Sequence, residues 1–326
     1  VRRALNGYPE VSEATRLRVL RAADEFGYRP NARARSLSTG QSMAIGHVLP
    51  VSTRTELVNP IFADFLAGAS ETYTTAGYNI LLTMVPDSDE VETYKAMAAQ
   101  HTVDGVIVHG PRVDDDRIEL LSSLGLPFVV HGRSSKIDVP YSWLDVNNTG
   151  AFRRAANLLM DLGHTRIALL NGNASLDFAV RRRAGFLSAL QDRGVVAEPD
   201  FVHHGDMTES YGYSTAEALL RGPTPPTAFL VASIIPGYGV RRAVEDAGLR
   251  LGKDVSVVVH DDDLSYFGSG NTVPFFTAVR SPVREAGRQA AEMLLAKIAD
   301  PLLGPEHRLL EAELTIGLST GPAPSD

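Results

Sequence analysis

The chain has 326 residues, of which 44% are hydrophobic, with no cysteine and a net charge of −8. This length and apolar content predict about two domains with buried cores. The absence of cysteine excludes disulfides, thiolate metal sites and cysteine nucleophiles, and it fits a reducing compartment. No apolar run is long enough to span a membrane and no secretory leader is recognised, so we expect a cytoplasmic protein.

Charge is distributed unevenly along the chain. Residues 1–42 contain eight arginines, no lysine and four acidic residues, a local charge of +4, so the remainder carries −12. An acidic chain should repel polyanions as a whole, and any contact with nucleic acid must be concentrated in this N-terminal segment. On charge alone, a solvated helix with spare arginines fits equally well.

The N-terminal segment predicts helical structure. Residues 1–7 (VRRALNG) have the pattern of a last helical turn closed by glycine, so we expect that helix to begin upstream of the chain as given. Ser12 is a plausible N-cap, and apolar residues recur at helical spacing from Val19 to Phe26. These features predict an amphipathic helix over residues 12–26.

From Met43 onward, apolar segments typical of strands alternate with helical patterns. Strands are predicted at 44–49, 79–83, 105–108, 128–130, 167–170, 228–231 and 255–259. Helices are predicted at 61–76, 91–100, 115–124, 150–162, 181–192, 211–220 and 237–247. The strand segments are continuously apolar, which indicates parallel sheets covered on both faces. The predicted fold class is α/β with doubly wound parallel sheets.

In such sheets, ligands bind beyond the carboxyl ends of the strands. The candidate positions at these ends are residues 59–62, His109, residues 131–133, Asn171, Ser233 and residues 260–262.

Enzyme motifs are weak or missing. Gly237-Tyr238-Gly239 lacks the third glycine of a dinucleotide-binding turn, and no Walker lysine or Gly-x-Ser-x-Gly elbow occurs. Asp261, Asp262 and Asp263 are adjacent carboxylates, which usually point in different directions, and no histidine lies at ligand spacing. His203-His204 is more typical of a structural or solvated pair than of a catalytic one. We therefore expect no enzyme activity, no metal and no cofactor.

Eight segments occur in an order and spacing that resemble a known family. They are VRRALNG (1–7), VSEATR (11–16), GYRPNARARSL (27–37), NPIF (59–62), VDGVI (103–107), LGHTRIA (162–168), RRAGF (182–186) and DVSVV (254–258). Together they resemble the bacterial transcription regulators of the lactose-repressor and galactose-repressor (LacI/GalR) family, from Val1 to about Gly317.

The resemblance implies a domain organisation. It implies a partial helix-turn-helix headpiece at 1–30, a hinge helix at 31–42, and two subdomains like those of periplasmic sugar-binding proteins. The first subdomain would comprise 43–147 with 278–303, and the second 148–277 with 304–321, so that the chain crosses near Asn147, Thr277 and Leu303. Residues 319–326 contain no apolar heptads, so we expect a homodimer without a four-helix tetramerisation tail.

The resemblance also implies DNA contacts. Arg3 matches the base-reading arginine of the recognition helix, and Arg2 stands where the family usually has a small hydroxyl residue. Leu37 resembles the leucine that is wedged into the minor groove, although without the resemblance it fits a linker residue packed on the core. The other hinge residues implied in DNA binding are Asn31, Arg33, Ala34 and Arg35. We expect the hinge to be disordered without DNA, and the chain as given to bind operator poorly because part of the headpiece is missing.

An effector site is implied between the subdomains. Phe62 and Met207 resemble the apolar residues on which effectors of the family stack. Arg182 and Asp261 resemble the polar pair that hydrogen-bonds effector hydroxyls. Without the resemblance, Arg182 would also fit a surface salt bridge and Asp261 a helix cap. The chain departs from the family at Ser233-Ile234, where many members carry Asn-Asp, and at Gly132, where an acidic residue is usual. The remaining candidates are His131, Trp143, Asp145 and Ser233, and Trp143 fits either sugar stacking or core packing.

The sequence thus predicts a homodimeric repressor of carbohydrate-utilisation genes, released from operator DNA by a small sugar that shifts the angle between subdomains. The alternatives are a purine-responsive regulator of the same family, a sugar-binding or transport protein without DNA binding, and an enzyme on the same scaffold.

Overall fold

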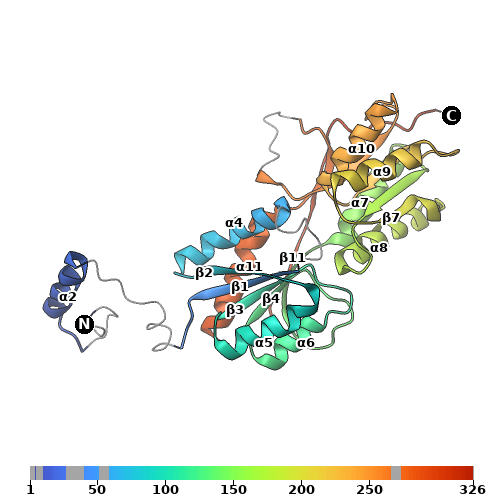
Figure 1. Cartoon of the computed structure of the whole chain (residues 1–326). Coiled ribbons are helices and arrows are strands. Elements are labelled where there is room, and N and C mark those ends of the chain that lie inside the picture. The colour runs from blue at the N-terminus through green and yellow to red at the C-terminus, as the bar shows by residue number, and fades with distance from the viewer. Residues whose placement is uncertain (1–3, 5–9, 27–39, 51–58, 266–272, 326) are drawn as a thin grey trace. The chain divides into compact units, whose positions relative to one another are not determined.

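The computed structural model describes residue 4 and residues 10–26, 40–50, 59–265 and 273–325. The chain forms two compact units, residues 1–43 and residues 44–326. Figure 1 labels their helices and strands.

In the first unit, α2 (Glu13–Glu25) confirms the predicted N-terminal helix. Ser12 is its N-cap, with the side chain accepting a hydrogen bond from the backbone nitrogen of Thr15 at 3.4 Å. Such a cap satisfies one of the free amides of the first turn. The residues expected to contact DNA, Arg2, Arg3, Asn31, Arg33, Ala34, Arg35 and Leu37, lie outside the described residues, and so do residues 31–39 of the hinge expected at 31–42.

The second unit is built on two sheets. The first has the order β11-β5-β4-β3-β1-β2, and every neighbouring pair in it is parallel. Its strands are β1 (Ala44–Pro50), β2 (Asn79–Val85), β3 (Gly105–His109), β4 (Phe128–His131), β5 (Ser142–Val146) and β11 (His307–Leu310). The crossover in strand order at β1 is the kind of position where α/β sheets bind ligands.

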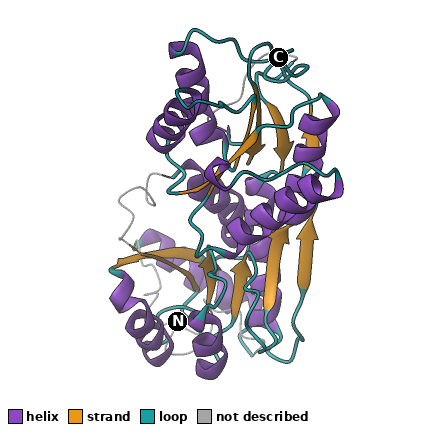
Figure 2. Ribbon diagram, turned by 90° about the vertical axis from the view of Figure 1, so that its right-hand side faces the viewer, coloured by secondary structure: helices purple, strands orange, loops and turns teal. Residues whose placement is uncertain are grey.

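The second sheet has the order β12-β10-β9-β8-β6-β7. It is parallel except for β12, which pairs antiparallel with β10 at the edge. Its strands are β6 (Ile167–Asn171), β7 (Val202–His204), β8 (Ala228–Val231), β9 (Ser256–Asp261), β10 (Thr277–Arg280) and β12 (Glu313–Thr315). Figure 2 shows the two sheets in two lobes, one above the other.

Helices cover both faces of each sheet. On the first sheet, Ile107 and Val129 pack with Phe65 of α4 (Pro60–Thr75) and Leu294 of α11 (Val283–Ala299), whereas Val106 belongs to a separate core. That core is completed by α5 (Glu90–Gln100) and α6 (Asp116–Leu124). Because successive strand residues point to opposite faces, the two helix pairs lie on opposite sides. The second sheet is covered by α7 (Asn148–Asp161), α8 (Asp177–Asp192), α9 (Glu209–Leu220) and α10 (Ile234–Asp246). Two short 3₁₀ turns span Asp87–Asp89 and Pro199–Phe201. The predicted doubly wound α/β fold is confirmed.

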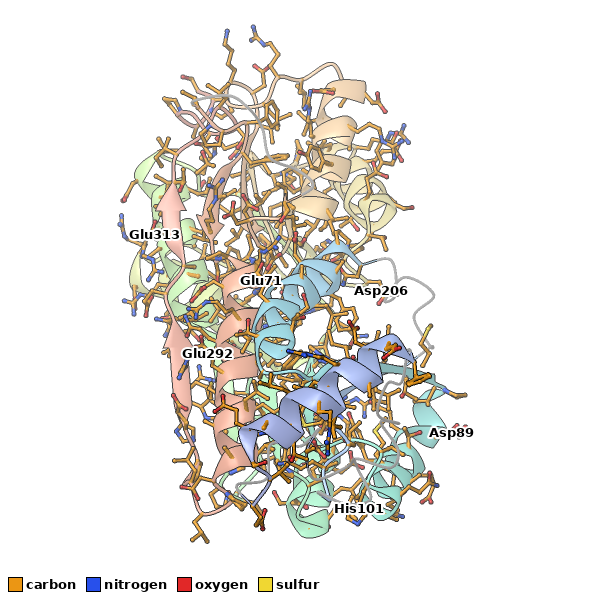
Figure 3. All side chains as sticks on the ribbon, turned by 90° about the vertical axis from the view of Figure 1, so that its left-hand side faces the viewer. Glu71, Asp89, His101, Asp206, Glu292 and Glu313 are labelled. Carbon is orange, nitrogen blue, oxygen red and sulfur yellow. The ribbon has the colours of Figure 1, made fainter. Side chains whose placement is uncertain are left out.

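Two glycines allow α4 and α11 to pack closely. A Cβ atom on Gly68 would lie 1.9 Å from the carbonyl oxygen of Arg284, and one on Gly287 would lie 2.0 Å from that of Phe65. Neither distance is sterically possible, so any larger residue would force the helices apart. Glu71 of α4, labelled in Figure 3, also accepts a hydrogen bond from Arg284 of α11 at 2.6 Å. This packing positions α4, whose first turn reaches the carboxyl end of the first sheet.

The chain passes between the two sheets after Val146, after Arg280 and after Leu310, because β10 belongs to the second sheet and β11 to the first. Crossings were expected near Asn147, Thr277 and Leu303, and the subdomain bounds built on them stay a prediction. The short strands β10 and β11 each extend the sheet that the chain then leaves.

Candidate functional site

A cleft of about 550 Å³ lies at the carboxyl ends of the strands of both sheets. His109 and His131 line it from the ends of β3 and β4, and Asp145 from β5, while His260 comes from β9. Its volume is in the range of pockets that hold small organic ligands. The cleft is therefore the candidate site, and its position follows the rule for parallel sheets.

Five residues predicted for the effector site line this cleft. They are Phe62, His131, Asp145, Arg182 and Met207. They come from α4, β4, β5, α8 and the loop before α9, so the fold brings together positions spread over most of the second unit. Their role in binding stays a prediction, but their convergence is a property of the structure.

Asp261 does not line the cleft within the described part of the chain, and Asp262 does. Asp261 Oδ1 accepts a hydrogen bond from the backbone nitrogen of Asp263 at 2.9 Å, and Oδ2 accepts one from Arg280 at 3.2 Å. His260 and Asp262 both face the cleft, as expected when alternate residues of an extended segment share a face. A role for Asp261 in binding stays a prediction, whereas the described cleft is lined by its neighbour Asp262, whose side chain points to the opposite face of the extended segment.

Trp143 and Ser233 are also absent from the described lining. The Trp143 ring stacks on His307 of the neighbouring strand, with centroids 4.7 Å apart, and the Arg133 guanidinium lies 4.7 Å from the Trp143 centroid. Trp143 occupies β5 two residues before Asp145 and also packs against the apolar core on one face of the first sheet. Ser233 is fully buried as the N-cap of α10, where its hydroxyl accepts from the backbone nitrogen of Ile235 at 3.3 Å. Trp143 fills space between strands, and Ser233 caps a helix.

Arg182 is the central cation of the cleft wall. Its Nε donates to Asn148 Oδ1 at 2.7 Å and its Nη1 donates to the carbonyl oxygen of Ala232 at 2.5 Å. The guanidinium lies between the rings of Phe152 and Phe178, at 5.1 and 4.7 Å from their centroids. Burial lowers the pKa of Arg182 to about 10, so it remains charged at neutral pH. No hydrogen bond from Nη2 is found within the described residues, which leaves a donor for a ligand.

A chain of hydrogen bonds joins Arg182 to the first sheet. Asn148, which accepts from Arg182, donates to Asp145 Oδ1 at 3.2 Å and to the carbonyl oxygen of Val146 at 3.0 Å. Asp145 Oδ2 in turn accepts from Arg133 Nε at 2.7 Å. Burial raises the pKa of Asp145, and the bond from Arg133 opposes that rise. The network ties the two sides of the cleft together at the first crossing between the sheets.

Aromatic and imidazole rings form the wall on the first sheet. His131 stacks on Phe65 with centroids 4.4 Å apart, and Phe62 meets His109 edge-on at 5.0 Å. His109 Nε2 lies 2.9 Å from Nδ1 of His47, which is buried behind it. Burial lowers the pKa of His131 to about 4 and that of His47 to about 3, and it lowers the pKa of His109 as well. The imidazoles of the wall are therefore neutral, and its aromatic rings suit the apolar face of a ligand ring.

Hydrogen bonds of residues 111, 112 and 135 with Leu176 and Asp177 join the two sides of the cleft at one end, and we call this group of contacts the latch. The backbone of Arg112 pairs with that of Leu176 in an isolated antiparallel bridge, and the backbone nitrogen of Asp177 donates to the carbonyl oxygen of Pro111 at 3.0 Å. The fully buried Asp177 carboxylate accepts from the backbone nitrogen of Ser135 at 2.8 Å and from the Ser135 hydroxyl. Because Asp177 begins α8, these contacts hold the helix that carries Arg182 against the first sheet.

Asn148, Phe178 and Asp206 are among the cleft residues that were not predicted from the sequence. Asn148 starts α7 directly after the first crossing, Phe178 lies one turn before Arg182 on α8, and Asp206, labelled in Figure 3, lies between the two lobes. The i and i+4 spacing of Phe178 and Arg182 was a usable signal, since such residues share a helix face. Asn148 and Asp206 carried no such signal.

Among the described residues, no group of three or more histidine, aspartate or glutamate side chains could hold a metal ion. Within the same residues, no helix is long and apolar enough to cross a membrane.

Comparisons with known proteins agree with this architecture. Residues 156–320 match the family model described as a periplasmic binding protein-like domain. The chain is 43% identical to the HTH-type transcriptional regulator AglR of Rhizobium meliloti (strain 1021), over 99% of this chain and 91% of the relative. The chain belongs to the LacI family of HTH-type transcriptional regulators.

Solved structures of this family have the same fold. The lac repressor dimer bound to operator and the anti-inducer ONPF matches with a TM-score of 0.84 and 27% identity, over 98% of this chain and 94% of that one. The transcriptional regulator CelR in complex with cellobiose matches with a TM-score of 0.76 and 29% identity, with the same coverage. The sequence-based prediction of a transcription regulator of the LacI family is thus confirmed.

Proposed function

We propose that this LacI-family regulator is a sugar-responsive repressor that binds a neutral sugar in the cleft. The observation that supports this most directly is that three kinds of group line the same cleft. They are the buried Arg182 guanidinium with a donor left for a ligand, the carboxylate of Asp262, and the aromatic rings of Phe62 and Phe65. Sugars present hydroxyls that accept from arginine and donate to carboxylate, and apolar ring faces that stack on aromatic groups. CelR, a relative, is solved with cellobiose.

The charge balance of the cleft favours a neutral effector over an anionic one. Arg133 is paired with Asp145, and Arg117 with the buried carboxylate of Asp115. Asp206 and Asp262 also line the cleft, and they would repel a phosphate or carboxylate group. A sugar phosphate would be repelled by these carboxylates. Of the arginines in the described lining, Arg112, Arg117 and Arg133 are already in ion pairs, so Arg182 alone would be left to bind the phosphate.

The DNA-binding half of the proposal rests on the family. Arg2 and Arg3 would contact bases or phosphates from the headpiece, and the hinge residues Asn31, Arg33, Ala34, Arg35 and Leu37 would meet the minor groove of an operator bound by a homodimer. We place the headpiece at 1–30, the hinge at 31–42, and the effector domain after residue 43. We infer that sugar binding favours one angle between the sheets and releases the operator. No enzymatic role is proposed.

The effector half is tested by a thermal-shift screen of the protein with neutral sugars, sugar phosphates and purines. Neutral sugars should raise the melting temperature, and the rise should grow with the logarithm of the sugar concentration above the dissociation constant. Stabilisation by purines alone would refute the sugar assignment and leave the regulator assignment intact. Stabilisation by sugar phosphates alone would refute the argument from the cleft carboxylates.

The DNA half is tested with full-length protein and an operator obtained by selection from random-sequence DNA. Fluorescence anisotropy should show weaker operator binding when the stabilising sugar is saturating, and equal binding would contradict the proposed control. Leu37→Ala should weaken operator binding, whereas Leu302→Ala, at a leucine 94% exposed on the effector domain, should not. Unchanged affinity in Leu37→Ala would reject the minor-groove wedge.

A further inference from the structure

His260 is an unpartnered imidazole in the wall of the cleft. It is the penultimate residue of β9, it is only 1% exposed, and it lines the cavity. Neither ring nitrogen has a hydrogen-bond partner within the described residues. Nδ1 lies 3.5 Å from Asp262 Oδ1, which is too long for a good hydrogen bond.

The other buried histidines show how unusual this environment is. His164 has Nδ1 at 2.9 Å from the Thr227 hydroxyl and Nε2 at 2.9 Å from the Ser256 hydroxyl, and it does not line the cleft. Nε2 of His47 also lacks a partner within the described chain, but His47 is fully buried behind the wall and bonds to His109 through Nδ1. Among the fully buried histidines of the described chain, only His260 combines two unpartnered nitrogens with a position on the cavity wall.

Leaving buried polar atoms without partners lowers stability, so such a group needs an explanation. The surroundings of His260 supply one. Its ring is nearly parallel to that of Phe152, at 6.5 Å, and the same Phe152 ring packs against the Arg182 guanidinium. Burial and the nearby Arg182 charge both lower the pKa of His260, against the weaker opposing effect of Asp262 and Asp261, and the imidazole is therefore neutral at neutral pH.

A neutral imidazole offers one donor nitrogen and one acceptor nitrogen. A hydroxyl group can complement either nitrogen, because it both donates and accepts. Asp262 beside it only accepts, and Arg182 only donates, so the three side chains together complement a pattern of adjacent hydroxyl groups. A ligand that lacked one of these hydroxyls would leave a buried nitrogen unpaired, and this is how sites built on hydrogen bonds discriminate most strongly.

We propose that His260 is a specificity-determining contact of the effector site, which hydrogen-bonds one hydroxyl of the sugar next to those held by Arg182 and Asp262. The inference rests on the proposed sugar effector and goes beyond it, because it assigns recognition of a particular hydroxyl to a side chain. His260 thus separates sugars that differ at a single hydroxyl.

The test uses calorimetry with the full chain and a panel of glucose, galactose, maltose, cellobiose, sucrose and trehalose. For the panel sugar that stabilises the wild type, His260→Phe should weaken binding by roughly tenfold or more, since it removes both nitrogens from the wall. His260→Gln, which keeps a donor and an acceptor, should retain more of the affinity. The matched control is His164→Gln, at the satisfied histidine, which should lower the melting temperature without changing sugar affinity.

Monodeoxy analogues of the same sugar separate direct recognition from a structural role. If His260 only stabilised the fold, its replacement would not change which hydroxyls of the sugar matter for affinity. The analogue that lacks the hydroxyl held by His260 should bind the wild type more weakly than the parent sugar does. In His260→Phe the same analogue and the parent sugar should bind with similar affinity, because the contact is already missing there. Unchanged affinity in His260→Phe, or equal binding of every monodeoxy analogue by the wild type, would overturn the inference while the sugar effector stands. If no sugar in the panel binds the wild type, the sugar proposal fails first, and the assignment of His260 fails with it.

Discussion

Replacing Arg182 by methionine tests the core of the effector site. Methionine fills the space of the arginine stem and packs well between Phe152 and Phe178, but it has no donor for a ligand. In the unliganded protein two effects oppose each other. The carbonyl of Ala232 and the amide oxygen of Asn148 lose their donor, while a buried cation that is costly to desolvate is removed. We therefore expect a small change in the unliganded melting temperature.

The effect on binding should be large. A hydrogen bond from a charged donor contributes about 1.5–3 kcal/mol, which corresponds to roughly a 10- to 100-fold increase in the dissociation constant when it is lost. At a sugar concentration 100 times the wild-type dissociation constant, stabilisation is about 2.7 kcal/mol for the wild type. It falls to about 0.4 kcal/mol if the dissociation constant rises 100-fold. A wild-type shift of roughly 5–10 °C would then shrink to about 1 °C.

The assay is thermal unfolding with and without the stabilising sugar, with Arg183→Met as the control. Arg183 is the next residue of α8, but it is exposed and does not line the cleft. Its replacement should leave the sugar-induced shift intact. A full shift in Arg182→Met would refute the assignment of Arg182, and an equal loss in Arg183→Met would show that the effect is not specific to the cleft.

The remaining predictions concern the latch and the buried histidines. Asp177→Asn should weaken sugar binding by up to about tenfold in calorimetry, because the amide holds Ser135 less tightly than the carboxylate; Asp192→Asn, at the exposed end of the same helix, is the control, and equal affinities in both would contradict a role for the latch. Burial keeps the pKa of His47 at about 3 and of His131 at about 4, well below the value near 6.5 of an unfolded histidine, so the unfolded chain binds more protons between these limits. This stabilisation is fully present above pH 6.5, and the free energy of unfolding should fall as pH drops towards 4, by up to about 1.4 kcal/mol per pH unit for each histidine. Urea unfolding at pH 7.5 and 5.0 measures the fall, which should be shallower in His47→Phe; an identical slope in that variant would refute the explanation.

The local pattern of the sequence was sufficient for the fold class. Continuously apolar strands such as β3 and β8 are buried on both faces, and their sequences show it directly. Two of the strands that were not predicted lack such a local signal. Strands β5 (SWLDV) and β11 (HRLL) mix polar and apolar residues, because β11 forms a half-exposed edge and β5 lies next to it. Their strand conformation depends on pairing with each other over a long stretch of chain.

The site was predictable where a residue's position follows from its own element, and not where it depends on contacts between elements. Arg182 could be chosen from its motif on a helix, and the positions at strand ends follow from parallel topology. The sequence could not determine which of Asp261 and Asp262 lines the cleft, because a shift of one residue in an extended segment reverses the face, and the register of β9 against β8 and β10 is a tertiary property. Likewise His109 and His131 meet because β3 and β4 pair in register, and Asp177 meets Ser135 across the cleft. Periodicity along one segment specifies which side chains turn inward, whereas the partner that each of them meets is decided only when distant segments pack.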